Sequence, residues 1–224
     1  MAIRVWLGTF AGEIGNWQEG HNWLDEDGAD SGLVPVAGDD VYFTAGSQDV
    51  QASTVSSAAV TLDSLNFGTK WTGSFVTTVD STSGESTNTA LDVALINATS
   101  LDYANKIGSV GLKGTFTTVN VQATSTDSPA LKLDDCPITT LSITGGSGTV
   151  LLAATTAVTG AINVIGARSA RLEIEASTTV SAADITMDSG RVVCYEELDT
   201  VVMYGGTLDM VNAAGTTDSI TIYE

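Results

Sequence analysis

Residues 172–195, LEIEASTTVSAADITMDSGRVVCY, alternate apolar and polar side chains in short bursts that small polar corners separate. Because side chains alternate along an extended chain, Leu172, Ile174 and Ala176 are expected on the buried face of a strand, and Arg171, Glu173 and Glu175 on the exposed face. After the corner the alternation resumes without the two-residue turn of a β-hairpin. The stretch therefore predicts a strand, a corner and another strand.

The same rhythm recurs along most of the chain. Apolar bursts follow one another at steps of 17–28 residues, and they begin at Val41, Leu65, Val93, Val119, Leu141, Ile162, Ile185, Val202 and Ile220. A single coil of a solenoid cannot bury its own apolar face, whereas stacked coils share a continuous core. The spacing predicts an all-β fold, a right-handed parallel β-helix, with these side chains inside: Leu141, Ile143, Ile162, Val164, Ile185 and Val202.

A β-sandwich is the alternative fold, because it too is built from regularly spaced short strands. Its turns come every ~8 to 12 residues and often carry Asn-Gly or Asp-Gly. In this chain only Asp27-Gly28 has that form, and it lies outside the repeating region. The sequence therefore favours the solenoid.

The composition is acidic but not that of a disordered chain. The 224 residues contain 27 Asp and Glu against 8 Lys and Arg, a formal net charge of −19, while 43% of the residues are hydrophobic and the mean hydropathy is +0.19. Hydrophobic content at this level predicts a folded core. The negative charge disfavours nucleic acid as a partner, because a phosphate backbone would be repelled.

The sequence contains no run of 18 apolar residues, so no membrane-spanning segment is expected. The first residues lack the pattern of a secretory signal, and we expect the chain to stay in the cytoplasm of the cell that makes it. Cys136 and Cys194 have neither metal-ligand nor redox spacing, so both are expected to be buried, reduced thiols.

Residues 1–40 differ from the rest and are expected to form an N-terminal cap or docking segment ahead of a solenoid domain at 41–224. They hold Trp17, Trp23, the single histidine His21 and a dense acidic run. A solenoid needs an end that shields its open core, and two tryptophans packed over the first coil would provide one.

Several residues of this segment follow a recognisable order: Gly15-Asn16-Trp17, Asn22-Trp23, Gly32, Pro35 and Gly38-Asp39-Asp40-Val41. This order resembles the opening motif ahead of parallel β-helix segments in bacterial autotransporter-like adhesins and in some phage virion proteins. The resemblance implies a β-helix. An adhesin of that type should carry an export signal and many more coils, so the resemblance, combined with the small size and the signal-less start, implies a phage structural protein.

The function expected on this basis is that of a capsid decoration or cement protein, located in the virion and assembled in the host cytoplasm. It would bind the major capsid protein as a homo-oligomer, most simply a trimer, and stabilise the head by bridging capsid subunits. Trp17, Trp23 and His21 are the expected partner-binding residues, because tryptophan is enriched at interaction hot spots. The alternative for both tryptophans is that they only cap the core. A carbohydrate-contacting adhesin or fibre module is the second functional hypothesis.

A polysaccharide lyase or hydrolase is the third hypothesis, because such enzymes also use parallel β-helices. Arg168 and Arg191 lie 23 residues apart, about one coil, and are expected to stack. By the same register, glutamates are expected side by side: Glu173 and Glu175 near Glu196 and Glu197. A ladder of outward charges that pair with one another explains this pattern without catalysis. No catalytic residue and no cofactor is therefore expected.

The segment DEDGADSG, residues 25–32, presents Asp25, Asp27 and Asp30 at the short spacing of a calcium loop. Glycine stands at its fourth position instead of the sixth, and Val36 occupies the twelfth position, where an EF-hand has glutamate. An acidic, solvated turn without a metal is the expectation.

Overall fold

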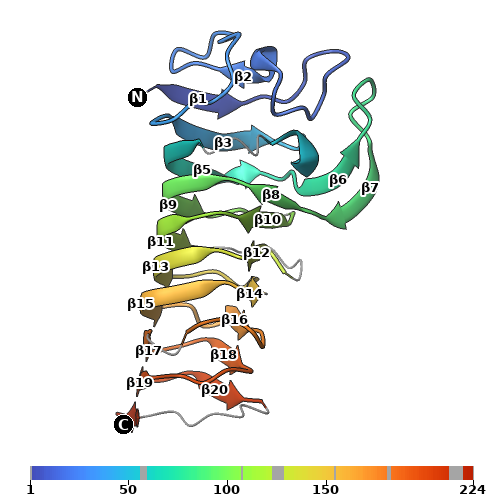
Figure 1. Cartoon of the computed structure of the whole chain (residues 1–224). Helices are drawn as coiled ribbons and strands as arrows, with labels where there is room; N and C mark the ends of the chain where they lie inside the picture. Colours follow the sequence, from blue (N-terminus) through green and yellow to red (C-terminus); the bar gives the residue numbers. More distant parts are fainter. Residues whose placement is uncertain are drawn as a thin grey trace.

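The computed structural model describes residues 2–55, 60–106, 108–122, 129–153, 155–180, 183–211 and 219–223. Within these ranges the fold is nearly all β, with two short 3-10 turns, η1 (Gly20–Asn22) and η2 (Ala52–Thr54). The strands stack as the rungs of a parallel β-solenoid of about eight turns (Figure 1). The predicted solenoid is confirmed, and the β-sandwich alternative is excluded.

The longest face of the solenoid, called sheet 1 below, has eleven strands. In spatial order they are β2 (Trp23–Leu24), β1 (Ile3–Trp6), β3 (Asp40–Gly46), β5 (Thr61–Trp71), β9 (Asn97–Tyr103), β11 (Phe116–Val121), β13 (Pro137–Ile143), β15 (Ala157–Val164), β17 (Asp184–Met187), β19 (Thr200–Met203) and β21 (Ser219–Ile222). All neighbouring pairs are parallel except β1 and β2.

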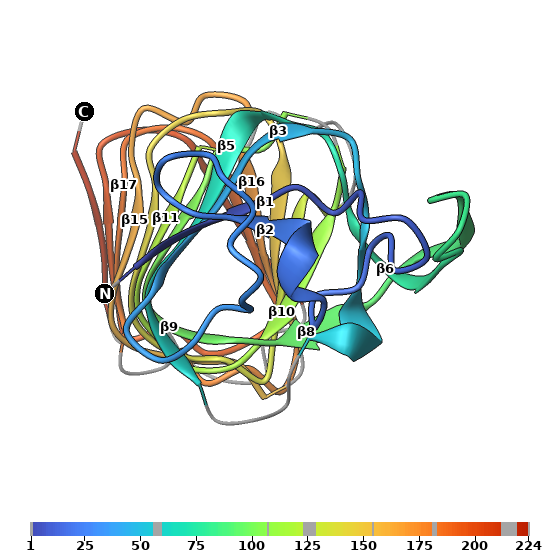
Figure 2. The same cartoon turned by 90° about the horizontal axis from the view of Figure 1, so that it is seen from above.

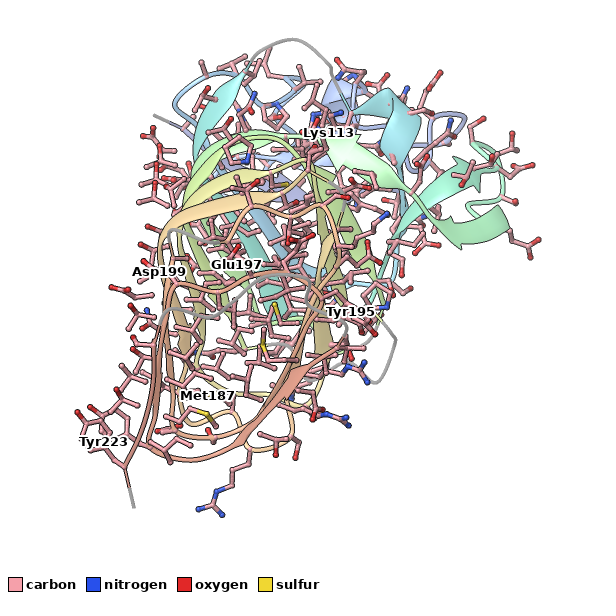
Figure 3. The ribbon with its side chains drawn as sticks, turned by 60° about the horizontal axis from the view of Figure 1, so that its bottom comes forward. Lys113, Met187, Tyr195, Glu197, Asp199 and Tyr223 are labelled. Atoms are coloured by element: carbon pink, nitrogen blue, oxygen red, sulfur yellow. The ribbon has the colours of Figure 1, made fainter. Side chains whose placement is uncertain are left out.

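A second face, sheet 2, has seven parallel strands. They are β8 (Val93–Leu95), β10 (Val110–Lys113), β12 (Leu131–Asp134), β14 (Thr149–Ala153), β16 (Arg171–Ile174), β18 (Arg191–Cys194) and β20 (Thr207–Met210). The core lies between sheets 1 and 2, where inward side chains from successive rungs stack. Figure 3 shows Met187 inside the coil, while Tyr195 and Tyr223 lie on its outside.

One column of residues in register runs along sheet 1 from β3 to its last strand; its members are buried as far as Val201, whereas Ile220 on the last rung is 48% exposed. Its members in rung order are Val41, Leu65, Leu101, Val119, Leu141, Ile162, Ile185, Val201 and Ile220. Two of the predicted burst positions do not belong to this column. Val93 lies in β8 on sheet 2, and Leu101 takes its place, while Val202 is displaced by Val201.

The predicted core residues are buried with one exception. Leu141, Ile143, Ile162, Val164 and Ile185 expose at most 1% of their surface. Val202 is only half-buried, because Val201 faces inward and alternation along the strand turns Val202 outward. Within the opening stretch, Leu172 and Ile174 are buried as expected, whereas the strand ends at Ile174 and leaves Ala176 exposed.

A small third sheet interrupts the regular winding near the N-terminal end. It consists of β4 (Val50–Gln51), β6 (Phe75–Val79) and β7 (Ser86–Leu91), and β6 and β7 form an antiparallel hairpin that projects from the side of the solenoid (Figures 1 and 2). The coil that contains it takes 36 residues from Leu65 to Leu101, whereas the next takes 18 to Val119.

The N-terminal segment is continuous with the solenoid. Strand β1 pairs in parallel with β3 and supplies a rung of its own, and β2 turns back antiparallel to β1. The expected boundary between residues 40 and 41 therefore falls inside β3, so residues 1–40 share a sheet with the coils that follow.

Candidate functional site

An aromatic cluster closes the N-terminal end of the solenoid. The Trp23 ring packs edge-on against Trp6 and Trp17, at centroid distances of 4.9 and 4.6 Å, and all three lie about 6 Å from Phe43 of the next rung. Viewed from above, the N-terminal segments cross the open end of the coil (Figure 2). The cluster therefore shields a core that would otherwise end in water.

The polar residues of the recognised motif hold this cluster in place. The buried Asn22 side chain donates to the carbonyl oxygens of Glu13 and Asn16, at 2.7 and 3.0 Å, and accepts from the Phe10 amide at 2.8 Å. Trp23 Nε1 donates to the Trp17 carbonyl at 2.9 Å. Buried polar groups need such partners, so Asn22 and the indole fix the path of residues 10–23.

Asp39 ties the first strand to the loop that follows the cap. Its buried carboxylate accepts from the amides of Ala2 and Val36, at 3.0 and 3.1 Å, and lies 3.4 Å from Arg4 Nε. The motif residues Asn22, Trp23 and Asp39 thus have structural roles.

Two of the expected partner-binding residues lie in the core. Trp17 is 4% exposed and Trp23 is fully buried, so the capping interpretation accounts for their positions, and docking through the indoles would require the cap to open. His21 lies at the surface. Its Nδ1 lies 2.7 Å from Asp30 Oδ2, and its ring stacks on Phe10 at a centroid distance of 4.7 Å.

Three exposed apolar residues near His21 were not predicted as partner-binding. Leu7 and Phe10 are each 42% exposed and Leu33 is 59% exposed. All border the 20–22 segment: the Leu7 amide donates to the Asn22 carbonyl, and the backbone at Leu33 packs against Gly20. Together, Leu7, Phe10, His21 and Leu33 are called the cap face below. An isolated apolar residue in a loop carries no periodic signal, so the sequence did not mark them.

The acidic segment beside the cap face forms turns. Asp25 Oδ1 accepts from the amides of Asp27 and Ala29, and Asp30 Oδ1 accepts from the Gly32 amide. The Gly32 amide, together with the hydrogen bond from His21, holds the pKa of Asp30 below its usual value. In the part of the chain that the structure describes, no three His, Cys, Asp or Glu side chains are arranged to hold a metal ion.

The outer face of sheet 2 carries half of the chain's eight Lys and Arg, each beside a carboxylate. The pairs are Lys113–Asp135 at 2.8 Å, Lys132–Asp134 at 2.8 Å, Arg171–Glu173 at 3.0 Å and Arg191–Asp209, with Nε 2.6 Å from Oδ2. Outward charges therefore pair on this face, but of the four glutamates expected in the ladder only Glu173 takes part in these pairs.

The predicted register of the basic cluster is wrong. Arg191 lies opposite Arg171, not Arg168, which sits in the turn before β16. Glu173 lies opposite Val193, not beside the glutamates at 196 and 197. A shallow depression on this face is lined by Glu173, Glu175, Ala176 and Tyr195. Within this depression, Glu173 forms an ion pair with Arg171 at 3.0 Å.

Both cysteines are buried free thiols, as expected. Burial raises the pKa of Cys136 to about 12, and it also raises the pKa of Cys194. A thiol with such a pKa is almost fully protonated at neutral pH, and the thiolate is the reactive form. The two cysteines therefore act as small apolar core residues.

Comparisons of the chain with protein-family models, with curated proteins and with solved structures find no match. Among the residues described, no helix is long and apolar enough to cross a membrane.

Proposed function

We propose that the chain is a structural attachment protein of a virion, a decoration or cement protein that binds the major capsid protein as a homotrimer. The single observation that carries the proposal is the combination of a capped solenoid with a widened N-terminal end. The cap is joined there to the small third sheet: the Ile14 amide donates to the carbonyl of Ser81, between β6 and β7, at 3.1 Å, and the Gln51 amide of β4 donates to the Gly15 carbonyl at 3.0 Å.

Such a shape suits a passive bridging role. A rod whose rungs are hydrogen-bonded along its length is stiff, so contacts made at its widened end lose little conformational entropy on binding. In a trimer, three ends would engage neighbouring capsid subunits together, and linked contacts raise avidity well above that of a single contact. The net charge of −19 would keep decorated particles apart in solution.

The proposal is tested by cosedimentation with heads assembled from the major capsid protein encoded in the same genome. The purified chain should pellet with the heads, saturate at a fixed ratio to capsid subunits and raise the temperature at which the heads disassemble. Failure to pellet at micromolar concentration would overturn the proposal. Sedimentation velocity on the free chain tests the trimer independently.

A carbohydrate-contacting module is the second candidate, and one observation favours it. Tyr204 and Tyr223, which directly follow the neighbouring strands β19 and β21 of sheet 1, stack at a centroid distance of 4.8 Å and are 58% and 53% exposed. Exposed tyrosine pairs offer both an apolar ring and a hydroxyl to a ligand. Binding to immobilised host-surface glycans that Tyr204→Ala abolishes, with no binding to heads, would favour this candidate.

A further inference from the structure

We propose that the cap face, Leu7, Phe10, His21 and Leu33, docks on a protein surface that is apolar at its centre and rich in Lys and Arg around it. The inference rests on the proposed function, since it names the chemistry of the capsid surface that the N-terminal end would meet. It assigns the contact to residues other than the buried Trp17 and Trp23.

The aromatic part of the cap face is held in position before any partner arrives. The Phe10 amide donates to Asn22 Oδ1 at 2.8 Å, and the Phe10 ring stacks on His21 with an interplanar angle of 29°. His21 is in turn held by Asp30. An exposed ring whose backbone and neighbour are already fixed loses little freedom on docking, which is the property of an interface anchor.

The charge around the cap face indicates the partner. Residues 1–40 contain eight Asp and Glu and one Arg, a net charge of −7, whereas residues 41–224 carry −12 over 184 residues. Arg4, the one Lys or Arg of this segment, lies beside Asp39 and lines a depression with the acidic run that includes Glu26 and Asp27. Two further carboxylates, Glu19 and Asp30, are hydrogen-bonded to His21 of the cap face itself. The N-terminal end is therefore the more acidic part of the molecule per residue.

A strongly negative surface selects against other negative surfaces. Like charges that meet across an interface weaken binding. The cap face should therefore repel a second cap face, an acidic glycan and a nucleic acid. A cationic protein surface would instead be steered toward the cap face, and its association would weaken as salt screens the attraction.

The first arm of the test removes the anchor. Phe10→Ala is compared with Tyr204→Ala, which removes a similarly exposed aromatic ring from the opposite end of the molecule. Using the heads defined above as the probe, Phe10→Ala is expected to weaken the Kd by about tenfold, the effect of losing an interface anchor, whereas Tyr204→Ala should leave it unchanged. Circular dichroism checks that both variants are folded.

The second arm removes charge. The double variant Glu26→Gln/Asp27→Asn is compared with Asp63→Asn/Glu197→Gln, which removes two exposed carboxylates from the solenoid. The cap variant should slow association several-fold at low salt and flatten its dependence on NaCl between about 50 and 500 mM, whereas the solenoid variant should retain the wild-type salt dependence.

The outcomes separate the two proposals. If wild-type chain does not bind heads, the proposed function and this inference both fall. If wild-type chain binds, but Phe10→Ala behaves like Tyr204→Ala or the two charge variants have the same salt dependence, the docking surface is wrong while the proposed function stands. A weaker Kd for Phe10→Ala and a flatter salt dependence for Glu26→Gln/Asp27→Asn, with both control variants like the wild type, support the docking surface.

Discussion

The N-terminal half and the remainder of the solenoid are built from different side chains. All four tryptophans and all five phenylalanines lie between residues 6 and 116, and most are buried in one connected stack that includes Phe43, Phe67, Trp71 and Phe75. Among the described residues from Val119 onward, the buried hydrophobic core consists of aliphatic residues with methionine and cysteine. Below, the part of this chain up to Phe116 is called its head, which is distinct from the phage heads of the binding assay, and the part from Val119 onward is called its stem.

The difference follows from what each region must enclose. In the stem every rung repeats the last, so side chains of similar size stack at a constant spacing and fill the coil. The head must close an open end and accommodate the β6–β7 hairpin, which leaves wider and irregular spaces. Large flat rings fill such spaces, and the Trp indole also offers a hydrogen-bond donor.

The largest expected effect lies at the centre of the head. Trp23→Ala should lower the free energy of unfolding by about 3–5 kcal/mol, because it removes a fully buried indole and leaves a cavity that the neighbouring rings can fill only in part. Ile162→Ala in the stem should cost about 2–5 kcal/mol. Urea unfolding measures both.

The same pair of variants tests whether head and stem unfold as one unit. All four tryptophans lie in the head, so fluorescence follows the head, while far-ultraviolet circular dichroism averages over the strands of both head and stem. Because coils contact mainly their neighbours, Trp23→Ala should shift the fluorescence transition more than the dichroism transition. Equal shifts by both probes would mean a single cooperative unit and would remove the energetic distinction between the regions.

The close stacking of stem rungs predicts a smaller loss of stability when a side chain is added at Gly160. A Cβ atom there would lie 2.6 Å from the Thr139 carbonyl oxygen of the neighbouring rung, where β15 and β13 shift register. Gly160→Ala should therefore destabilise the protein by about 1–3 kcal/mol through overpacking. Gly145→Ala is the matched control, because no atom lies within 4 Å of its Cβ position, and it should change stability by less than about 0.5 kcal/mol. Similar thermal shifts for the two variants would contradict the tight spacing.

The burial of Cys136 in the stem predicts that the protein loses stability at alkaline pH. The pKa of Cys136 is about 12 in the folded protein and about 9 for an exposed thiol, so the folded state keeps a proton that the unfolded state loses. Stability is thus fully present below pH 9 and falls as the pH rises toward 12, by about 1.4 kcal/mol at pH 10. Urea titrations at pH 7.5 and 10 should show this loss in the wild type and a smaller loss in Cys136→Ala. An equal loss of stability in the wild type and in Cys136→Ala would mean that titrating groups other than Cys136 cause it.

The smallest effect is expected on the outer face of the stem. Arg191→Gln breaks the pair with Asp209, in which the two side chains are 55% and 33% exposed. Exposed ion pairs contribute little, so the variant should lose less than about 1 kcal/mol in thermal or urea unfolding. A loss comparable to that of Gly160→Ala would show that the charge ladder of sheet 2 matters more to the stem than its exposure suggests.

The fold could be predicted from the sequence because its signals are local and repeated. The alternation of apolar and polar residues in 141–143 and 172–174 identifies the inward side chains of each strand. The regular steps between the apolar bursts indicate stacked coils. The candidate site was predicted only in part. The N-terminal segment was expected to cap the core, yet the exposed Phe10 and Leu33 beside His21 have no pattern that distinguishes them from other loop residues.

What the sequence determined by itself is the period of the winding, the inward face of most strands and the acidic charge of the N-terminal segment. The tertiary structure decided which rungs align: Leu101 instead of Val93 in the inward column, Val201 instead of Val202, and Arg171 instead of Arg168 opposite Arg191. The physical reason is that alternation has a period of two and is the same in every strand, so it leaves the register between strands open. Corner lengths, the inserted hairpin and the packing of each rung on the next select one register, and a slip of a single residue turns a side chain from the core to the solvent.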